Sequence, residues 1–267
     1  MNLERKIERL VGAQVLECDP LAGGDLSSVT RARLAGGRTI VAKSGPLVEA
    51  EARMLRALAA RGIPVPAVIA AEPGLLLMAH LPAGGALSGP AWQDLAAILN
   101  QLAAAPEAAY GWREDYAFGP VAIANPLMDD WPDFWAEHRL RCHLPHLPSR
   151  LGQRVERLAA TIGERLPGHP PAALLHGDVW GGNVLVADGR ISGLIDPACY
   201  RGDREVDVAM PTLFDHPPAC FFDALDLAPG WRDRLPVYRL WPLLVHVRLF
   251  GGGYLASAER ELDRLGA

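Results

Sequence analysis

The segment from Leu174 to Asp196 constrains the fold and chemistry of this 267-residue chain more than any other part. Short apolar runs flank the polar turn HGDVWGGN (residues 176–183), and a further apolar run ends at Ile195-Asp196. The runs 184–186 and 193–195 predict a β-hairpin. We expect this hairpin to present Asp178, Asn183 and Asp196 on one side.

These three polar groups have the spacing that phosphoryl transfer requires. In kinases, one aspartate orients the nucleophilic hydroxyl and accepts its proton, while an asparagine and a second aspartate bind Mg²⁺. Asp178 and Asn183 are five residues apart, as in a kinase catalytic loop, and Asp196 follows the next strand-like run. An Asp–Asn pair in a turn is by itself ordinary turn chemistry. Three such groups between apolar runs favour the functional interpretation.

The N-terminal part supplies groups suited to nucleotide phosphates. Residues 29–34 and 39–43 are strand-like runs around a glycine turn, which predicts a hairpin, and residues 47–61 have helical spacing. Lys43 ends the second run, like the kinase lysine that binds the α- and β-phosphates, although a lone strand lysine is otherwise a solvated edge residue. Glu51 in the following helix is placed to pair with Lys43, and Glu49 competes for that role.

The remaining candidates for an ATP site lie in a loop and at a strand end. The loop residues, at which backbone amides could approach phosphates, are Gly23, Gly24, Ser27 and Ser28. This loop has no strict G-x-G-x-x-G, so a plain hairpin turn is the alternative. The apolar run 75–78 reads as a buried strand, and we assign its last residue, Met78, and the nearby His80 to the same site.

Helical patterns dominate after residue 81, so the sequence predicts an α+β, bilobal, protein-kinase-like fold. We expect a small antiparallel-sheet N-lobe at residues 1–80, which binds the nucleotide, and a larger, mainly helical C-lobe at 81–267 with the metal and acceptor site. Four long helical segments are expected, at 88–104, 129–143, 151–166 and 235–254, the last kinked at Pro242.

The composition of the chain limits the kinds of partner and the cell compartment that we expect for it. The net charge of −5 gives no general attraction to nucleic acid or to an anionic membrane. Four scattered cysteines favour a reducing compartment, and no secretory signal or membrane span is visible, so we expect a cytoplasmic location. The sequence does not determine the oligomeric state, for which we favour a monomer. A metal site is conceivable in the cluster His138, Cys142, His143 and His146. We favour the interpretation that it is the surface of a structural helix, and that Trp131 and Trp135 are packing groups.

The chain resembles the fructosamine/ketosamine-3-kinase family, relatives of aminoglycoside and choline kinases, over nearly its whole length. The matching stretches are residues 23–25, 49–52, 130–140, 175–180, 195–200, 204–210 and 249–254. The resemblance implies ATP- and Mg²⁺-dependent phosphorylation of the C3 hydroxyl of a glycated amine or of a glycated lysine on a protein. A phosphate at C3 can be expelled, which frees the amine and implies deglycation repair.

The same resemblance implies roles for single residues. Lys43 would bind the α/β-phosphates, Glu51 would orient Lys43, Asp178 would be the base, and Asn183 and Asp196 would hold Mg²⁺. Trp180 would stack on the sugar, Glu205 would bind the substrate, and Asp207 would brace the catalytic loop from a helix start.

The chain departs from the family pattern at a few positions, among them Asp203, Pro242, Val245 and Asn100, several of which we expect to line the acceptor side. A kinase of another small hydroxyl compound, such as an aminoglycoside or amino alcohol, is therefore the alternative enzyme. A non-catalytic nucleotide-binding pseudokinase is the alternative from another class. Such proteins typically lack one of the four polar residues Lys43, Asp178, Asn183 and Asp196.

Overall fold

The computed structural model describes residues 2–21 and 28–267, and the chain divides into two compact units. The N-terminal unit comprises Met1–Ala91 together with Gly182–Pro197, and the helical unit comprises Trp92–Gly181 together with Ala198–Ala267. The first break falls after Ala91, where the sequence predicted a boundary after residue 80, and residues 182–197 also belong to the N-terminal unit. The predicted assignment of nucleotide and acceptor functions to the two lobes stays a prediction.

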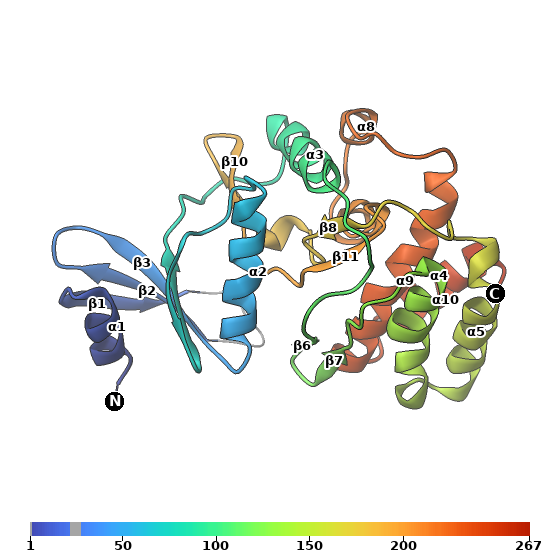
Figure 1. Cartoon of the computed structure of the whole chain (residues 1–267), viewed down its shortest axis with the longest axis horizontal. Helices are drawn as coiled ribbons and strands as arrows, with labels where there is room; N and C mark the ends of the chain where they lie inside the picture. The colour runs from blue at the N-terminus through green and yellow to red at the C-terminus, as the bar shows by residue number, and fades with distance from the viewer. Residues whose placement is uncertain (1, 22–27) are drawn as a thin grey trace. The chain divides into compact units, whose positions relative to one another are not determined.

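The N-terminal unit is built on a five-stranded antiparallel sheet (Figure 1). Its strand order is β1 (Val15–Pro20), β2 (Ser28–Leu34), β3 (Thr39–Ser44), β5 (Leu75–Ala79) and β4 (Val68–Glu72). The β2–β3 pairing confirms the hairpin predicted from residues 29–43. The edge strands β1 and β4 were not predicted.

Two helices pack on this sheet, and its period-2 alternation explains how. On one side, Ile7 of α1 (Leu3–Val11) packs with Ile40, Leu75 and Leu77. On the other, α2 (Val48–Ala60) places three side chains on the alternate strand residues Leu76 and Met78. Successive strand residues point to opposite faces, so Lys43 of β3, three positions after Ile40, faces α2. The strand and helix patterns thus fix the direction of Lys43.

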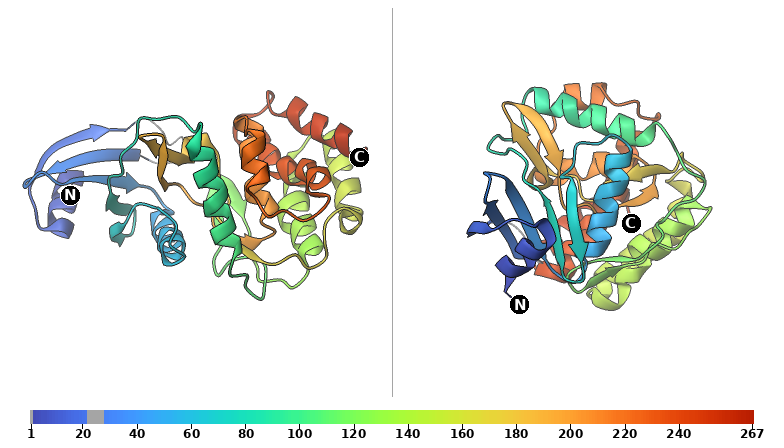
Figure 2. Two further views of the ribbon diagram at one scale, coloured as in Figure 1. Left: turned by 90° about the horizontal axis from the view of Figure 1, so that it is seen from above. Right: turned by 60° about the vertical axis from the view of Figure 1, so that its left-hand side comes forward.

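The hairpin of β9 (Val184–Ala187) and β10 (Arg190–Leu194) completes the N-terminal unit (Figure 2). It confirms the hairpin predicted from the sequence. Two backbone hydrogen bonds hold it to earlier parts of the unit: Leu194 N–H donates to the Pro64 carbonyl over 2.8 Å, and Gly85 N–H donates to that of Val186 over 2.9 Å. Both strands of the hairpin are therefore fixed to the sheet-bearing unit.

The second unit is mostly helical, with two short antiparallel strand pairs, β6 (Tyr116–Phe118) with β7 (Val121–Ile123) and β8 (Ala173–Leu175) with β11 (Tyr200–Gly202). Its helices are α3 (Pro90–Ala103), which begins in the N-terminal unit, α4 (Trp131–Trp135), η1 (Ala136–Leu140), η2 (Arg141–His146), α5 (Ser149–Ala160), η3 (Ile162–Glu164), α6 (Glu205–Ala209), α7 (Pro211–Phe214), α8 (Ala219–Asp223), α9 (Trp231–Phe250) and α10 (Leu255–Leu265).

The helix predicted at 129–143 changes its winding along its length. It begins as α4, becomes the π-helix η1 and ends as the 3₁₀-helix η2. Trp131 and Trp135 are fully buried, which confirms them as packing groups. Arg139 of η1 is also fully buried, and its guanidinium lies over the rings of Tyr200 and Trp241 at 4.2 and 5.0 Å. An aromatic cage thus surrounds this charge.

The candidate metal cluster near η2 is spread between core and surface. His143 is buried, whereas Cys142 and His146 are exposed.

Within residues 2–21 and 28–267, no helix is both long and apolar enough to cross a bilayer. The expected cytoplasmic location stays a prediction.

Candidate active site

Lys43 forms the centre of the polar cluster in the N-terminal unit. Its Nζ lies 2.7 Å from Glu51 Oε2 and 2.8 Å from Asp196 Oδ1, and only 8% of its side chain is exposed. Burial lowers the pKa of Lys43, but the nearby Glu51 and Asp196 outweigh it and raise that pKa overall. Lys43 is therefore held as a cation. The predicted pairing with Glu51 is confirmed, and the competing choice of Glu49 is not.

The hairpin brings Asn183 and Asp196 to the same cluster. Asn183 directly precedes β9, Asp196 lies two residues after β10, and Ile195 N–H donates to the Asn183 carbonyl over 3.0 Å. Asp196 has φ 54°, a left-handed conformation that costs about 1 kcal/mol or more in a residue other than glycine. Such strain points to a functional constraint, because the surrounding structure must hold it in place.

The predicted catalytic loop belongs to the helical unit and is anchored by Asp207. One carboxylate oxygen of Asp207 accepts from His176 N–H over 2.7 Å, and the other accepts from Gly177 N–H over 2.9 Å. The predicted bracing of the loop from a helix start is thereby confirmed. Burial raises the pKa of Asp207 to about 6, although the two N–H donors oppose the shift.

Gly177 has to be glycine at this point of the loop. Its φ of 81° is left-handed, and a Cβ there would collide with the Ala198 carbonyl. Ala198 N–H in turn donates to the His176 carbonyl over 2.8 Å, next to the β8–β11 pairing. The loop is thus held from both sides of the chain, by Asp207 and by Ala198.

Asp178 and Trp180 follow this anchored backbone. Asp178 is half-buried, and Trp180 is 38% exposed. Both lie in the helical unit, whereas Lys43, Glu51, Asn183 and Asp196 lie in the N-terminal unit, and the chain joins the two sets at Gly181-Gly182. The predicted placement of Asp178 on one side with Asn183 and Asp196 stays a prediction.

Asp215 is a residue near the loop that sequence reasoning missed. Its Oδ2 accepts from Gly181 N–H over 2.9 Å, and a Cβ on Gly181 would collide with its Oδ1. Asp215 stands 34 residues away in the sequence and directly follows α7. The sequence signal for this contact was the glycine pair at 181–182. Glycine indicates a close approach to the backbone but does not identify the residue that approaches it.

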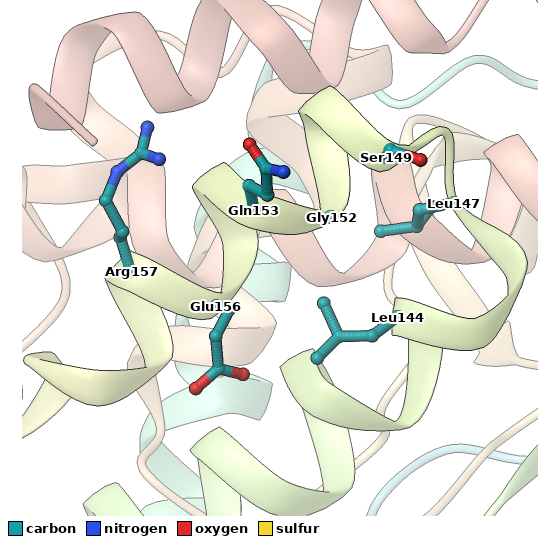
Figure 3. Close-up of a pocket in the computed structure, with 7 residues that line it drawn as sticks. All are labelled: Leu144, Leu147, Ser149, Gly152, Gln153, Glu156 and Arg157. Carbon is teal, nitrogen blue, oxygen red and sulfur yellow. The ribbon is translucent and has the colours of Figure 1, made fainter.

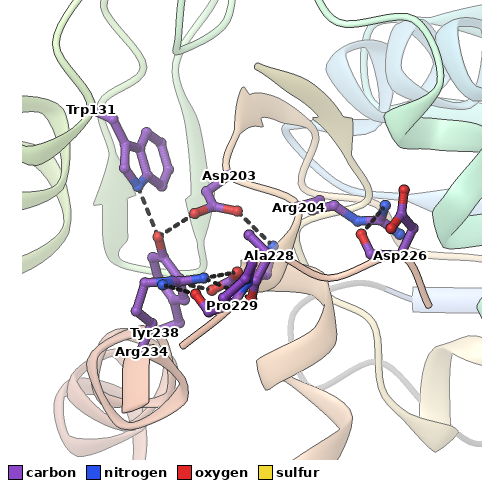
Figure 4. Close-up of polar contacts among 9 residues, drawn as sticks. Trp131, Asp203, Arg204, Asp226, Ala228, Pro229, Arg234 and Tyr238 are labelled. Carbon is purple, nitrogen blue, oxygen red and sulfur yellow. Dashed lines mark hydrogen bonds and ion pairs between the residues drawn. The ribbon is translucent and has the colours of Figure 1, made fainter. Parts of the chain in front are cut away.

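Glu205 is buried and paired with an arginine. Arg234 binds it with two nitrogens, Nε over 2.7 Å and Nη2 over 2.5 Å. Tyr238 donates its hydroxyl to Asp203 over 2.7 Å and accepts from the Trp131 indole over 3.0 Å (Figure 4). A substrate would have to displace Arg234 to reach Glu205, and the predicted substrate-binding role of Glu205 stays a prediction.

Three of the departures from the family pattern, Asp203, Pro242 and Val245, are buried in the helical unit. The expectation that several such positions line the acceptor side stays a prediction. Asn100 accepts from Arg204 Nη2 over 2.6 Å, and its amide donates to the Ala224 carbonyl over 2.9 Å. These residues form interior contacts between the helices of the unit.

The other predicted nucleotide-binding residues fall into three groups. Gly23, Gly24 and Ser27 lie outside the described residues, while Ser28 is exposed at the start of β2. Met78 packs in the cluster under α2 and is 6% exposed. His80 is exposed directly after β5.

A hollow of about 560 Å³ lies between η2 and α5 (Figure 3). Its lining includes Leu144, Leu147, Gly152, Glu156 and Arg157. None of its lining residues belongs to the predicted site. The hollow therefore gives no support to a catalytic role for this surface.

The sheet with its buried lysine–glutamate pair and the anchored loop define a protein-kinase-like fold. The chain is similar to aminoglycoside phosphotransferase APH(4)-Ia, solved as a ternary complex with ADP and hygromycin B, with TM-score 0.69 and 19% identity over 99% of this chain and 96% of that one. At that identity the likeness shows the fold alone. Residues 6–267 match the profile of the fructosamine kinase family, so the chain belongs to this family.

Individual relatives agree with that assignment. The probable ketoamine kinase of Thermus thermophilus is 38% identical over 91% of this chain and 92% of its own length. That of Synechocystis sp. is 37% identical over 64% of this chain, and the match spans 60% of the Synechocystis protein. A solved structure from Thermobifida fusca that carries the name fructosamine-3-kinase has TM-score 0.89 and 30% identity, covering 100% of this chain and 99% of that one.

Proposed function

We propose that this chain transfers the γ-phosphoryl group of ATP to the C3 hydroxyl of a ketosamine, as a step in the repair of glycated amines. The observation that carries the proposal is the buried Lys43 held between Glu51 and Asp196. A lysine fixed between a helix glutamate and a metal-binding aspartate is the arrangement kinases use for nucleotide phosphates. Family membership supports the choice of a ketosamine as acceptor.

The residues present fit ATP with Mg²⁺. Asn183 and Asp196 offer an amide oxygen and carboxylate oxygens, the ligand type that Mg²⁺ prefers, and they share one end of the hairpin. Bound Mg²⁺ would neutralise charge on the phosphates. Lys43 would exchange its contact with Asp196 for a phosphate oxygen while Glu51 keeps it oriented.

Asp178 is the proposed base. It would orient the acceptor hydroxyl and accept its proton as the oxygen attacks phosphorus. The backbone N–H bonds to Asp207 two and one residues earlier limit the movement of this loop. Trp180, two residues later and 38% exposed, is the proposed face for the sugar.

The proposal is tested by ADP release from purified enzyme with Mg²⁺–ATP and a set of acceptors. The set holds fructosyl-, ribulosyl- and erythrulosyl-amines, an aminoglycoside and choline. We expect turnover with at least one ketosamine and a loss of roughly 10²–10⁴-fold in kcat for Asp178→Asn. Turnover with only the aminoglycoside or choline would assign a different acceptor, and ATP binding without any turnover would indicate a pseudokinase.

A further inference from the structure

A row of five aromatic side chains begins at the predicted catalytic loop and continues across the helical unit. We call Trp180, Phe214, His246, Phe250 and Tyr254 the aromatic row. The Trp180 and Phe214 ring centroids are 5.6 Å apart, those of Phe214 and His246 are 5.3 Å apart, and His246 lies 4.7 Å from Tyr254 and 5.6 Å from Phe250. One continuous set of ring contacts therefore joins the loop to the end of α9.

This row is open to solvent at both ends. Phe250 is 52% exposed and Trp180 is 38% exposed. They are two of the five large apolar side chains that are exposed among residues 2–21 and 28–267. Exposed apolar side chains that cluster beside a polar site are typical of a ligand surface rather than of a packed core.

A carboxylate adjoins the row where it meets the loop. Asp215 follows Phe214 in the chain, is half-buried, and accepts from Gly181 N–H, the residue after Trp180. Two neighbouring contacts, Trp180 with Phe214 and Gly181 with Asp215, thus place an acidic group next to the exposed indole.

His246 lies in the middle of the row. Its Nδ1 lies 2.7 Å from the Pro242 carbonyl, which can only accept, so Nδ1 carries a hydrogen. Burial also lowers the pKa of His246. The combination of aromatic faces with a nearby carboxylate attracts organic ammonium groups.

We propose that Asp215 and the aromatic row bind the amine side of the acceptor, as an alkylammonium group with an apolar substituent. Asp215 would take the cationic nitrogen, and Phe214 and Phe250 would take the substituent. This inference rests on the proposed function, because a ketosamine carries its nitrogen on C1, close to the C3 hydroxyl. Asp215 would then be a specificity-determining residue. The enzyme would favour acceptors with a basic amine and an apolar substituent over acceptors with an acidic substituent.

The test compares two acceptors that differ in one atom, the ketosamine of benzylamine and 1-O-benzylfructose, in which an ether oxygen replaces the amine. Steady-state kinetics are measured for wild type, Asp215→Asn and Phe250→Ala. Asn keeps an oxygen for the Gly181 N–H but removes the charge. The matched controls are Asp223→Asn and Leu127→Ala, which alter an exposed acid and an exposed apolar side chain outside the row.

We expect Asp215→Asn to raise the KM of the amine about tenfold and that of the ether less than about twofold, with the KM of ATP unchanged. Phe250→Ala should raise both acceptor KM values about fivefold, because both carry the benzyl group. The control variants should leave both acceptor KM values unchanged.

Equal effects of Asp215→Asn on the two acceptors would overturn the inference, since the residue would then act through Gly181 alone. Phe250→Ala alters an exposed side chain, so it can be judged even if the Asp215 variant misfolds. An unchanged KM for both acceptors in Phe250→Ala would also overturn the inference. Wild-type enzyme that releases ADP with another ketosamine but not with that of benzylamine would overturn the inference and leave the proposed function standing. No ADP release with any ketosamine would contradict the proposed function, and the inference would fall with it.

Discussion

Lys43 Nζ lies 2.8 Å from Asp196 Oδ1, although the two residues are 153 positions apart in the chain. The contact joins β3 to the end of the β9–β10 hairpin within the N-terminal unit. It places the cation proposed for the phosphates beside a carboxylate proposed for Mg²⁺. Substitutions at this pair, at Glu51 and at Asp207 should therefore have measurable effects on activity or stability.

Glu51→Gln should lower kcat/KM for ATP by about 10- to 100-fold, because it removes the charge that orients Lys43 from α2. The acceptor KM should change little. Glu49→Gln is the matched control on the same helix, since Glu51 and not Glu49 forms the ion pair with Lys43. Steady-state kinetics with varied ATP check the result. Equal losses in both variants would show that the Lys43–Glu51 pair has no special role.

Asp196→Asn should abolish Mg²⁺-dependent turnover, because it removes the carboxylate charge proposed to hold the metal. Asp188→Asn is a suitable control, since Asp188 also has a left-handed φ, 52°, but lies in the exposed turn between β9 and β10. Activity is measured while the Mg²⁺ concentration is varied at fixed ATP. Normal Mg²⁺ dependence in the Asp196 variant would contradict its assignment as a ligand.

The pKa of Asp207 makes stability depend on pH with a defined sign. Burial raises this pKa from 3.8 to about 6, so the folded chain binds the proton more tightly than the unfolded chain. The resulting stabilisation, about 3 kcal/mol, is present below pH 4 and is lost as pH rises through 6.

Asp207→Asn removes this titration. The free energy of unfolding of wild type minus that of the variant should therefore fall by about 3 kcal/mol between pH 3 and pH 7 in urea titrations. Asp223→Asn, at an exposed position, should leave the pH dependence as in wild type. A constant difference between wild type and Asp207→Asn would show that the pKa of Asp207 is not raised.

Much of the N-terminal unit could be predicted because its signals are local. The β2–β3 hairpin follows from two strand-like runs around a glycine turn, and the Lys43–Glu51 pair follows from a strand and the helix after it. The strand β1 was missed because Glu17 and Asp19 interrupt its apolar pattern; it is held instead by ladder bonds to β2.

Features that depend on distant contacts could not be predicted. The bond from Gly181 to Asp215 joins residues 34 positions apart with no motif between them. The π-helical winding of η1 arises where Arg139 enters a cage of rings from α4, β11 and α9, which no local propensity encodes. The return of residues 182–197 to the N-terminal unit is likewise visible only in three dimensions.

Arg139→Lys should destabilise the fold by about 2–4 kcal/mol. Arg139 is fully buried, donates to Asn125 Oδ1 over 2.6 Å and to the Ala124 carbonyl over 2.9 Å, and stacks on Tyr200. A lysine ammonium cannot reproduce the planar fork or the stacking and would leave acceptors unpaired. Urea unfolding measures the change. Arg157→Lys on α5, outside this cage, should stay within about 0.5 kcal/mol of wild type.

The enzyme should not need activating phosphorylation. The segment from Pro197 to Arg204 contains no serine or threonine. It includes β11 and leads directly into α6. The hydroxyl side chain in this segment belongs to Tyr200, which is buried and pairs with Leu175 in the β8–β11 ladder. Phosphatase-treated enzyme, confirmed unmodified by intact mass, should turn over at the untreated rate. Activity that appears only after phosphate is added to this segment would contradict the prediction.

The membership of the β9–β10 hairpin in the N-terminal unit has a consequence for the gene. The unit is discontinuous: its first 91 residues are separated from residues 182–197 by ninety residues of the helical unit, 92–181. A truncated reading frame that stops near residue 91 would leave Pro64 and Gly85 without their hairpin partners and Lys43 without Asp196. Recombination therefore could not move the sheet-bearing unit as one contiguous piece of sequence. Exchange between genes has to take both segments, or the whole chain.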